Sequence, residues 1–277
     1  MSSHIARPAD SWQPVPVHQR PFAREIGDRR VWMLVFMRAS ALQGAHPVVA
    51  QGIVDHSRVW TDPTGRIPET IRYGLALYLG DDQAATAGEI RELHRGIGGH
   101  LDDGSRYHAW NRDVWLWVHL TTIEAILFAL ERCFGPLDES EVARFYDQSC
   151  GAASMYGIPG TALPGSVAEL RRVVAEALPR LEESSATRKI HAFTEEQLSL
   201  LLPGPAVASR LLGIPLGGWL RALTYGTYPE VIRERWGIAW AARDERRARI
   251  ALGVVRRLGA LPERVRLLPQ ARAMLAR

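Results

Sequence analysis

The residues best suited to chemistry in this sequence are histidines. Four of the nine, His46, His56, His94 and His119, stand among apolar residues that read as helical. The other five lie in polar, terminal or loop segments. A buried imidazole needs a hydrogen-bond partner or a metal, because leaving it unsatisfied costs about 1–3 kcal/mol. The four apolar histidines are therefore the first candidates for a functional site.

His119 is the strongest of these candidates, because it follows four large apolar residues, Trp115 to Val118, and its helix face should be buried. Position alone leaves two interpretations open. The ring is either a core histidine bonded to a backbone carbonyl or a metal ligand. His94 raises the same question. Arg91 precedes it by three residues, so both side chains could point into one cavity. A buried arginine needs an anionic partner, and the propionates of a haem are one such partner.

The sequence lacks the motifs of other catalytic and metal-binding sites. The sequence has no H-E-x-x-H zinc motif, no paired Glu-x-x-His helices, no G-x-S-x-G elbow, no Walker A loop and no G-x-G-x-x-G after a strand. Two cysteines do not make a disulfide framework or a thiolate cluster. The net charge of +4 is too small to indicate nucleic-acid binding.

The elements that position these residues are predicted to be helices throughout, without strand pairs. Pro47 should begin a new helix within the apolar stretch 31–57. Thr86 and Glu89 form a capping-box pattern for a helix over 86–97, which the glycines at 96–99 end. Asp113 should cap the helix that turns His119 and Thr122 inward. Further helices are predicted from Asp138 to about Cys150, near 167–181, from Thr194 onward, and over 219–235 and 240–258; loops are predicted at 155–165 and 212–219.

This pattern predicts an extended arm over residues 1–27 and one all-α domain over 28–277, a multi-helix bundle. The segment 182–193 is the best linker candidate. The longest apolar runs, such as 114–118, fall short of a bilayer span, and no leader opens the chain, so we expect a cytoplasmic protein. Arginines are dense from Arg233 onward but are interspersed with acidic residues. They indicate a solvated helix face, with peripheral membrane or partner contact and homo-oligomerisation left open.

Taken together, the segments resemble the haem-dependent oxygenases that include bacterial latex-clearing protein and the MpaB-type oxygenase. The matching stretches are RASALQGAHPVVAQGIVDHS at 38–57, EIRELHRGIGG at 89–99, YHAWNRDVWLWVHLTTIEA at 107–125, GPLDESEVARFYDQS at 135–149, YGIPGTALPGS at 156–166 and YPEVIRERWGIAW at 228–240. No single stretch is diagnostic, but their order and spacing are fairly specific over about residues 28–270.

The resemblance implies an all-α fold around one haem b, with His119 as the proximal iron ligand. It implies that Arg91 and His94 lie on the opposite haem face, where His94 either binds the iron or stands near it; latex-clearing protein has a lysine at this position. Arg38 and His46 match the first motif and are expected to shape the pocket. Thr122, on the inward face with His119, completes the expected haem contacts. Polyisoprene is not carried over as a substrate, because the rubber-cleaving members are longer and secreted.

The resulting hypothesis is oxidation of a small apolar, isoprenoid-like or secondary-metabolite substrate by O₂ at ferrous haem. Arg91 and His94 would donate hydrogen bonds on the O₂ side. The alternative is a bis-histidine haem sensor or electron carrier, in which His94 closes the sixth site. A third hypothesis is a helical scaffold that has lost its cofactor and acts as a binding protein.

Overall fold

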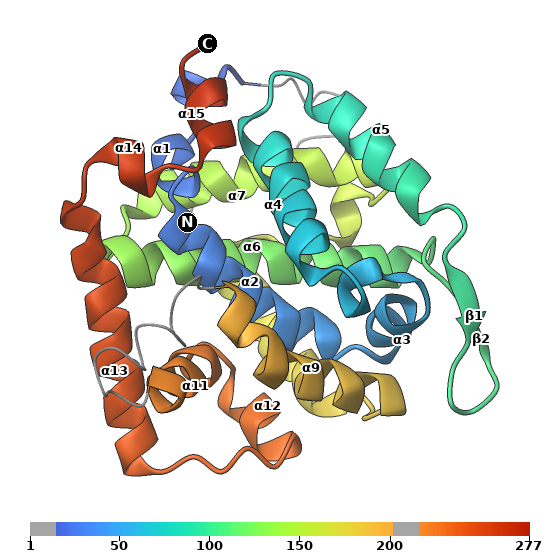
Figure 1. The fold of residues 1–277 in the computed structure, drawn as a ribbon. Coiled ribbons are helices and arrows are strands. Elements are labelled where there is room, and N and C mark those ends of the chain that lie inside the picture. Colours follow the sequence, from blue (N-terminus) through green and yellow to red (C-terminus); the bar gives the residue numbers. More distant parts are fainter. Residues whose placement is uncertain (1–14, 202–215) are drawn as a thin grey trace.

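The computed structural model describes residues 15–201 and 216–277 and confirms the all-α prediction (Figure 1). The helices are α1 (Ala23–Ile26), α2 (Arg29–Gly44), α3 (Pro47–His56), α4 (Pro63–Leu79), α5 (Gln83–His94), α6 (Arg112–Phe134), α7 (Glu139–Ala153), α8 (Val167–Ala177), α9 (Ser185–Leu201), α11 (Leu216–Gly226), α12 (Glu230–Arg235), α13 (Ala242–Arg257), α14 (Glu263–Arg266) and α15 (Pro269–Leu275). In the described part of the chain, β1 (Gly98–His100) and β2 (Arg106–His108) form a short antiparallel hairpin that the sequence analysis did not predict.

Helix α6 runs through the middle of the bundle, with α2 packed along it and α7 on another side (Figure 1). Most of its residues are buried, including Ile123, Ile126, Leu127 and Leu130, which are fully inaccessible. The helix is long and apolar enough to cross a membrane by length and composition, but 67% of its most apolar window is buried inside the molecule. Such burial is typical of a core helix, and α6 provides the rigid frame on which His119 stands.

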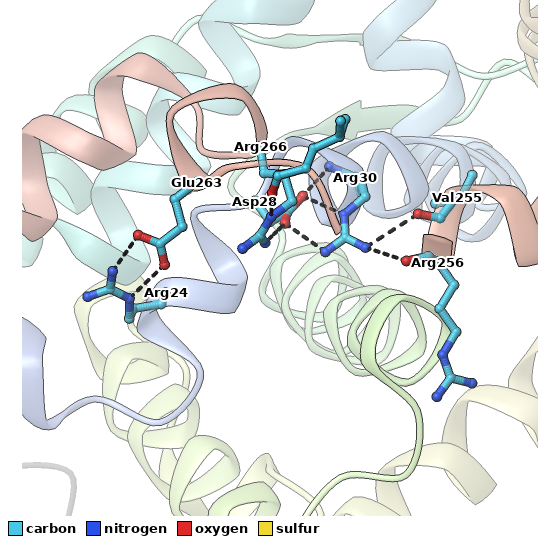
Figure 2. A network of polar contacts seen from close by, with 8 residues as sticks. Arg24, Asp28, Arg30, Val255, Arg256, Glu263 and Arg266 are labelled. Atoms are coloured by element: carbon cyan, nitrogen blue, oxygen red, sulfur yellow. Dashed lines mark hydrogen bonds and ion pairs between the residues drawn. The ribbon is translucent and has the colours of Figure 1, made fainter. Parts of the chain in front are cut away.

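The start of α2 is fixed by Asp28, whose buried carboxylate caps the helix through the backbone N–H of Arg30. The same carboxylate accepts hydrogen bonds from the guanidinium groups of Arg30 and Arg266 (Figure 2). Arg30 in turn donates to the carbonyls of Val255 and Arg256 at the end of α13. This polar cluster therefore ties the C-terminal helices to the N-terminal end of the core.

Several helix boundaries follow the sequence prediction. Pro47 begins α3, and Asp138 caps α7 by accepting from two backbone N–H groups. Two caps lie earlier than predicted. Asp82 caps α5, so the helix begins three residues before Thr86. Asn111 caps α6 in place of Asp113, which lies in the first turn, where a carboxylate is favoured by the helix dipole.

The predicted linker 182–193 is wrong, because α9 begins at Ser185 and continues through Thr194 without a break. Side chains of this segment pack on the neighbouring elements. Phe193 and Lys189 both contact the ring of Trp60, and Ile190 is buried. The N-terminus of α9 is held by Asp102 of the hairpin loop, which accepts from the backbone N–H and hydroxyl of Ser185.

The structure describes only part of the predicted N-terminal arm and of the predicted loop at 212–219. In the predicted arm, residues 15–27 form a 3₁₀ turn (Val17–Gln19) and α1, and bury Val17, Ala23 and Ile26. Residues 1–14 lie outside the described residues, as does 212–215 of the predicted loop at 212–219. The predicted helix over 219–235 is interrupted between α11 and α12.

Candidate functional site

His119 lies in the first half of α6, and its Nε2 atom is buried without a hydrogen-bond partner. Burial lowers the pKa of His119 to about 4, and the main chain of Ser149 on α7 acts in the opposite direction. Since Nε2 has no partner, Nδ1 is the ring atom that faces the Ser149 main chain. The ring is therefore neutral near pH 7 and offers its Nε2 lone pair to the interior. A metal-binding histidine commonly has this arrangement, with the second nitrogen bonded to a backbone carbonyl.

The space beside His119 is a small cavity of about 50 Å³. Its lining is mostly aromatic and apolar, with Tyr78, Phe145 and Tyr156 among the wall residues. The side-chain oxygen of Gln83, another wall residue, is also buried without a partner. A volume of this size holds a few water molecules.

His94 lines a different and larger cavity, of about 300 Å³, between α3, α4, α5 and α6. Aliphatic side chains form much of its wall, and the charged side chains of Arg66 and Glu69 also line it. The Nδ1 atom of His94 lies 2.7 Å from the carbonyl oxygen of Ile90, one turn earlier. Burial lowers the pKa of His94, the Ile90 carbonyl opposes this, and the charge of Arg66 adds to the lowering. His94 is therefore neutral near pH 7, with Nδ1–H donating to Ile90 and Nε2 as a proton acceptor.

A stacked aromatic pair forms the wall between the two cavities. Trp115 lines the larger cavity, Tyr156 lines the smaller one, and their ring centroids are 5.0 Å apart with a 20° interplanar angle. The ring of His94 meets the same Trp115 edge-on at 5.3 Å. The Nε1 atom of Trp115 is buried without a partner, one helical turn before the equally unpartnered Nε2 of His119. Both nitrogens are therefore available to a further hydrogen-bond partner or ligand.

Arg91 does not share the cavity of His94. Its side chain is exposed, and its guanidinium carbon lies 5.1 Å from the centroid of the Trp110 ring. Although the i,i+3 spacing places both residues on neighbouring parts of α5, Trp110, in the loop after the hairpin, draws the arginine outward. The structure thus brings His94 and Trp115 together and leaves Arg91 at the surface.

The remaining three predicted contacts lie along α2, α3 and α6 and do not line either cavity. Arg38 forms a two-point ion pair with Glu124 of α6 and donates to the carbonyl of Thr227. The hydroxyl of Thr122 donates to the Val118 carbonyl and accepts from the Gln43 amide. His46 precedes α3, packs 6.1 Å from the Trp117 ring and has a buried Nδ1 without a partner. Burial lowers the pKa of His46.

The sequence predicts Trp115 on the inward face of its helix with His119, because four residues separate them, and Trp115 does line a cavity. Other residues that shape the two cavities were not predicted. Tyr156 lies in a 3₁₀ turn after α7, and Glu69, paired with Arg58 and Arg66, lies on α4. Nothing local in the sequence places these residues at the site. Among the described residues, no group of three or more His, Cys, Asp or Glu side chains could hold a metal ion. Axial ligation of a macrocycle, in contrast, needs a single side chain.

The fold and the site define a mostly helical protein with two neutral imidazoles, His119 and His94, in two neighbouring cavities beside the aromatic pair of Trp115 and Tyr156. A protein-family model described as "ER-bound oxygenase mpaB/B'/Rubber oxygenase, catalytic domain" matches residues 23–257. This match covers most of the chain, and the protein belongs to that oxygenase family. No curated protein and no solved structure matched the chain.

Proposed function

We propose that this protein is a haem b-dependent oxygenase that oxidises a small apolar substrate with O₂, and that His119 holds the iron. The observation that carries the proposal is the buried, unpartnered Nε2 of a neutral imidazole inside a member of an oxygenase family. The donor fits the group, because haem iron commonly takes a neutral imidazole nitrogen as its axial ligand.

The small volume of the cavity beside His119 limits how haem could bind there. About 50 Å³ is too little for a tetrapyrrole, and pockets for ligands of drug size usually have about 300–1,000 Å³. The neighbouring cavity of about 300 Å³ is separated from His119 by the Trp115–Tyr156 pair. Holding haem at His119 therefore requires this aromatic pair to shift so that the two cavities join.

When bound, haem would supply the redox chemistry toward O₂, and the chain's residues would provide orientation and polarity. The main chain of Ser149 lies beside the His119 ring, and the unpartnered Nε2 is the atom that would bind the iron. The aliphatic wall of the larger cavity would bind an apolar substrate and exclude water. His94, tied to Ile90 through Nδ1, would accept a proton at Nε2. The hydrogen-bond donation to O₂ that the sequence suggested for His94 does not follow from this tautomer.

The bis-histidine sensor or electron carrier is less well supported, because His94 and His119 line different cavities with Trp115 between them. Ferrous protein that binds CO would favour the oxygenase, since CO needs an open coordination position. Failure to bind CO would favour the alternative.

The central test is reconstitution of the purified protein with haem. We expect one haem per chain and a Soret band, strong loss of haem from His119→Gly, and recovery of the band when imidazole is added to that variant. His100→Ala removes an exposed hairpin histidine and should leave the spectrum unchanged. A His119→Ala protein with full haem content and an unaltered Soret band would rule out His119 as the ligand.

A further inference from the structure

The segment from α13 through the following 3₁₀ turn to α14 carries a row of exposed aliphatic side chains. Among the described residues, six large hydrophobic side chains are exposed, and five of them follow one another in this part of the chain. Ile250 and Val254 lie one turn apart on α13, Leu258 begins the 3₁₀ turn that follows, Leu261 comes directly after that turn, and Val265 lies on α14. The five residues are Ile250, Val254, Leu258, Leu261 and Val265, and each is between 42% and 50% exposed.

Arginines frame this aliphatic row. Residues 242–266 contain eight arginines against Asp244, Glu245 and Glu263, a net charge of +5, so the rest of the chain is close to neutral beside a total of +4. Arg246 and Arg257 lie four and seven residues from Ile250, and the helical repeat places them on the same face. Both are exposed, and neither forms an ion pair within the described part of the chain.

We propose that this face of α13–α14 docks on an anionic lipid surface. The combination of a narrow aliphatic row with flanking arginines suits the interface of a bilayer, where the aliphatic groups enter the acyl boundary and the guanidinium groups stay at the phosphates. A second copy of the chain fits less well, because an isologous contact would bring the two sets of arginines together. Nucleic acid would leave the aliphatic row in water.

The place of the face in the fold agrees with this role. Helix α13 forms one flank of the molecule, with α11 packed on its inner side (Figure 1). The buried residues of α13, among them Ala248 and Val255, face the bundle. The hairpin and the end of α5, next to the cavity of His94, lie on the opposite flank (Figure 1). Docking through α13 would therefore leave the hairpin and the end of α5 uncovered.

The test is sedimentation of the full-length protein with vesicles of phosphatidylcholine alone or with one third phosphatidylglycerol. We expect binding to the anionic vesicles that weakens in high salt, and little binding to the neutral ones. A basic residue near an anionic surface contributes about a fivefold factor in binding, so Arg246→Gln/Arg257→Gln should bind about 25-fold more weakly. Arg95→Gln/Arg112→Gln, with the same loss of charge at two exposed sites at the end of α5 and the start of α6, should bind as the wild type does.

The aliphatic row is tested separately. Ile250→Ser/Val254→Ser should lose most binding to anionic vesicles, whereas Leu93→Ser, which changes the sixth exposed residue, should keep it. The proposal is overturned if the wild-type protein does not sediment with anionic vesicles. It is also overturned by a dimer in solution that Ile250→Ser/Val254→Ser converts to a monomer, because the face would then be covered by a second copy.

Discussion

At the residue scale, Arg38 shows how a side chain can match a family motif and still serve the fold. Its guanidinium meets Glu124 at two points, 2.9 and 2.5 Å, and stacks 4.3 Å from the centroid of the Phe128 ring. Both partners of the ion pair are largely buried, with side chains 15% and 10% exposed. The pair joins α2 to α6 and lies outside both cavities.

This placement predicts a stability effect without an effect on haem. Arg38→Met would leave the Glu124 carboxylate buried without its partner, and we expect the free energy of unfolding to fall by about 3 kcal/mol in urea titrations. Arg38→Met/Glu124→Met removes both charges and should recover most of that loss. Haem content in the reconstitution assay should stay the same in both variants. A loss of haem from the double variant would instead support the contact with haem that the sequence suggested.

The residue types at the site could be predicted from the sequence, but their partners could not. His119 was singled out because large apolar residues precede it, and its Nε2 is buried in the structure. Arg91 was expected beside His94 because three residues separate them. The ring of Trp110, which holds Arg91 outside, comes from a different element. Such tertiary contacts can override the orientation that helical spacing predicts, and the neighbouring sequence does not reveal them.

At the element scale, helix existence was predictable and helix ends were less so. Thr86 and Glu89 match a capping box, but Asp82 offers a stronger acceptor to the N–H of Ala85 at 2.8 Å, and the helix begins there. The segment 182–193 looked like a linker because it is polar. Its few apolar residues, among them Ile190 and Phe193, pack on α2 and α3 or on Trp60, and that burial outweighs the weak local propensity.

The packing of α4 on α2 gives a prediction at this scale. A Cβ atom at Gly74 would lie 2.3 Å from the Trp32 ring, which is held by a hydrogen bond from its Nε1 to the Ile26 carbonyl. A Cβ atom added at Gly88, in the interior of α5, would have nothing within 4 Å. Gly88→Ala should therefore stabilise the protein by about 1 kcal/mol through helix propensity. Gly74→Ala should be destabilised relative to Gly88→Ala by about 1–3 kcal/mol, because of overpacking.

Thermal unfolding of the two alanine variants beside the wild type measures this difference. Trp32→Phe/Gly74→Ala, with a smaller ring, should regain part of the loss. Equal melting temperatures for the two single variants would mean that α4 and α2 are not packed as closely as Gly74 and Trp32 indicate.

At the scale of the whole molecule, the cluster around Asp28 joins the two ends of the described chain (Figure 2). Arg30, 5% exposed, and Arg266, 18% exposed, share one carboxylate that is fully inaccessible. Burial alone would raise the pKa of Asp28, but hydrogen bonds from Arg30 and Arg266 outweigh it and lower the pKa below 3.8. The folded protein therefore binds fewer protons at this carboxyl than the unfolded chain does in acid.

This difference makes the stability of the molecule depend on pH in a defined direction. The stabilisation from Asp28 is complete above the unfolded pKa of about 3.9 and is lost as the pH falls through the lower folded value.

Asp28→Asn keeps an acceptor for the α2 cap but leaves Arg30 buried without its anion, so we expect a loss of about 3 kcal/mol at pH 7. The gap between wild type and variant should narrow steadily as the pH falls below about 4. Glu263→Gln changes an exposed carboxylate of a separate ion pair with Arg24 and should cost less than about 1 kcal/mol at any pH. Urea titrations of the three proteins from pH 3 to 7 measure both gaps, and a gap for Asp28→Asn that stays constant with pH would mean that Asp28 is not the carboxylate that couples acid to unfolding.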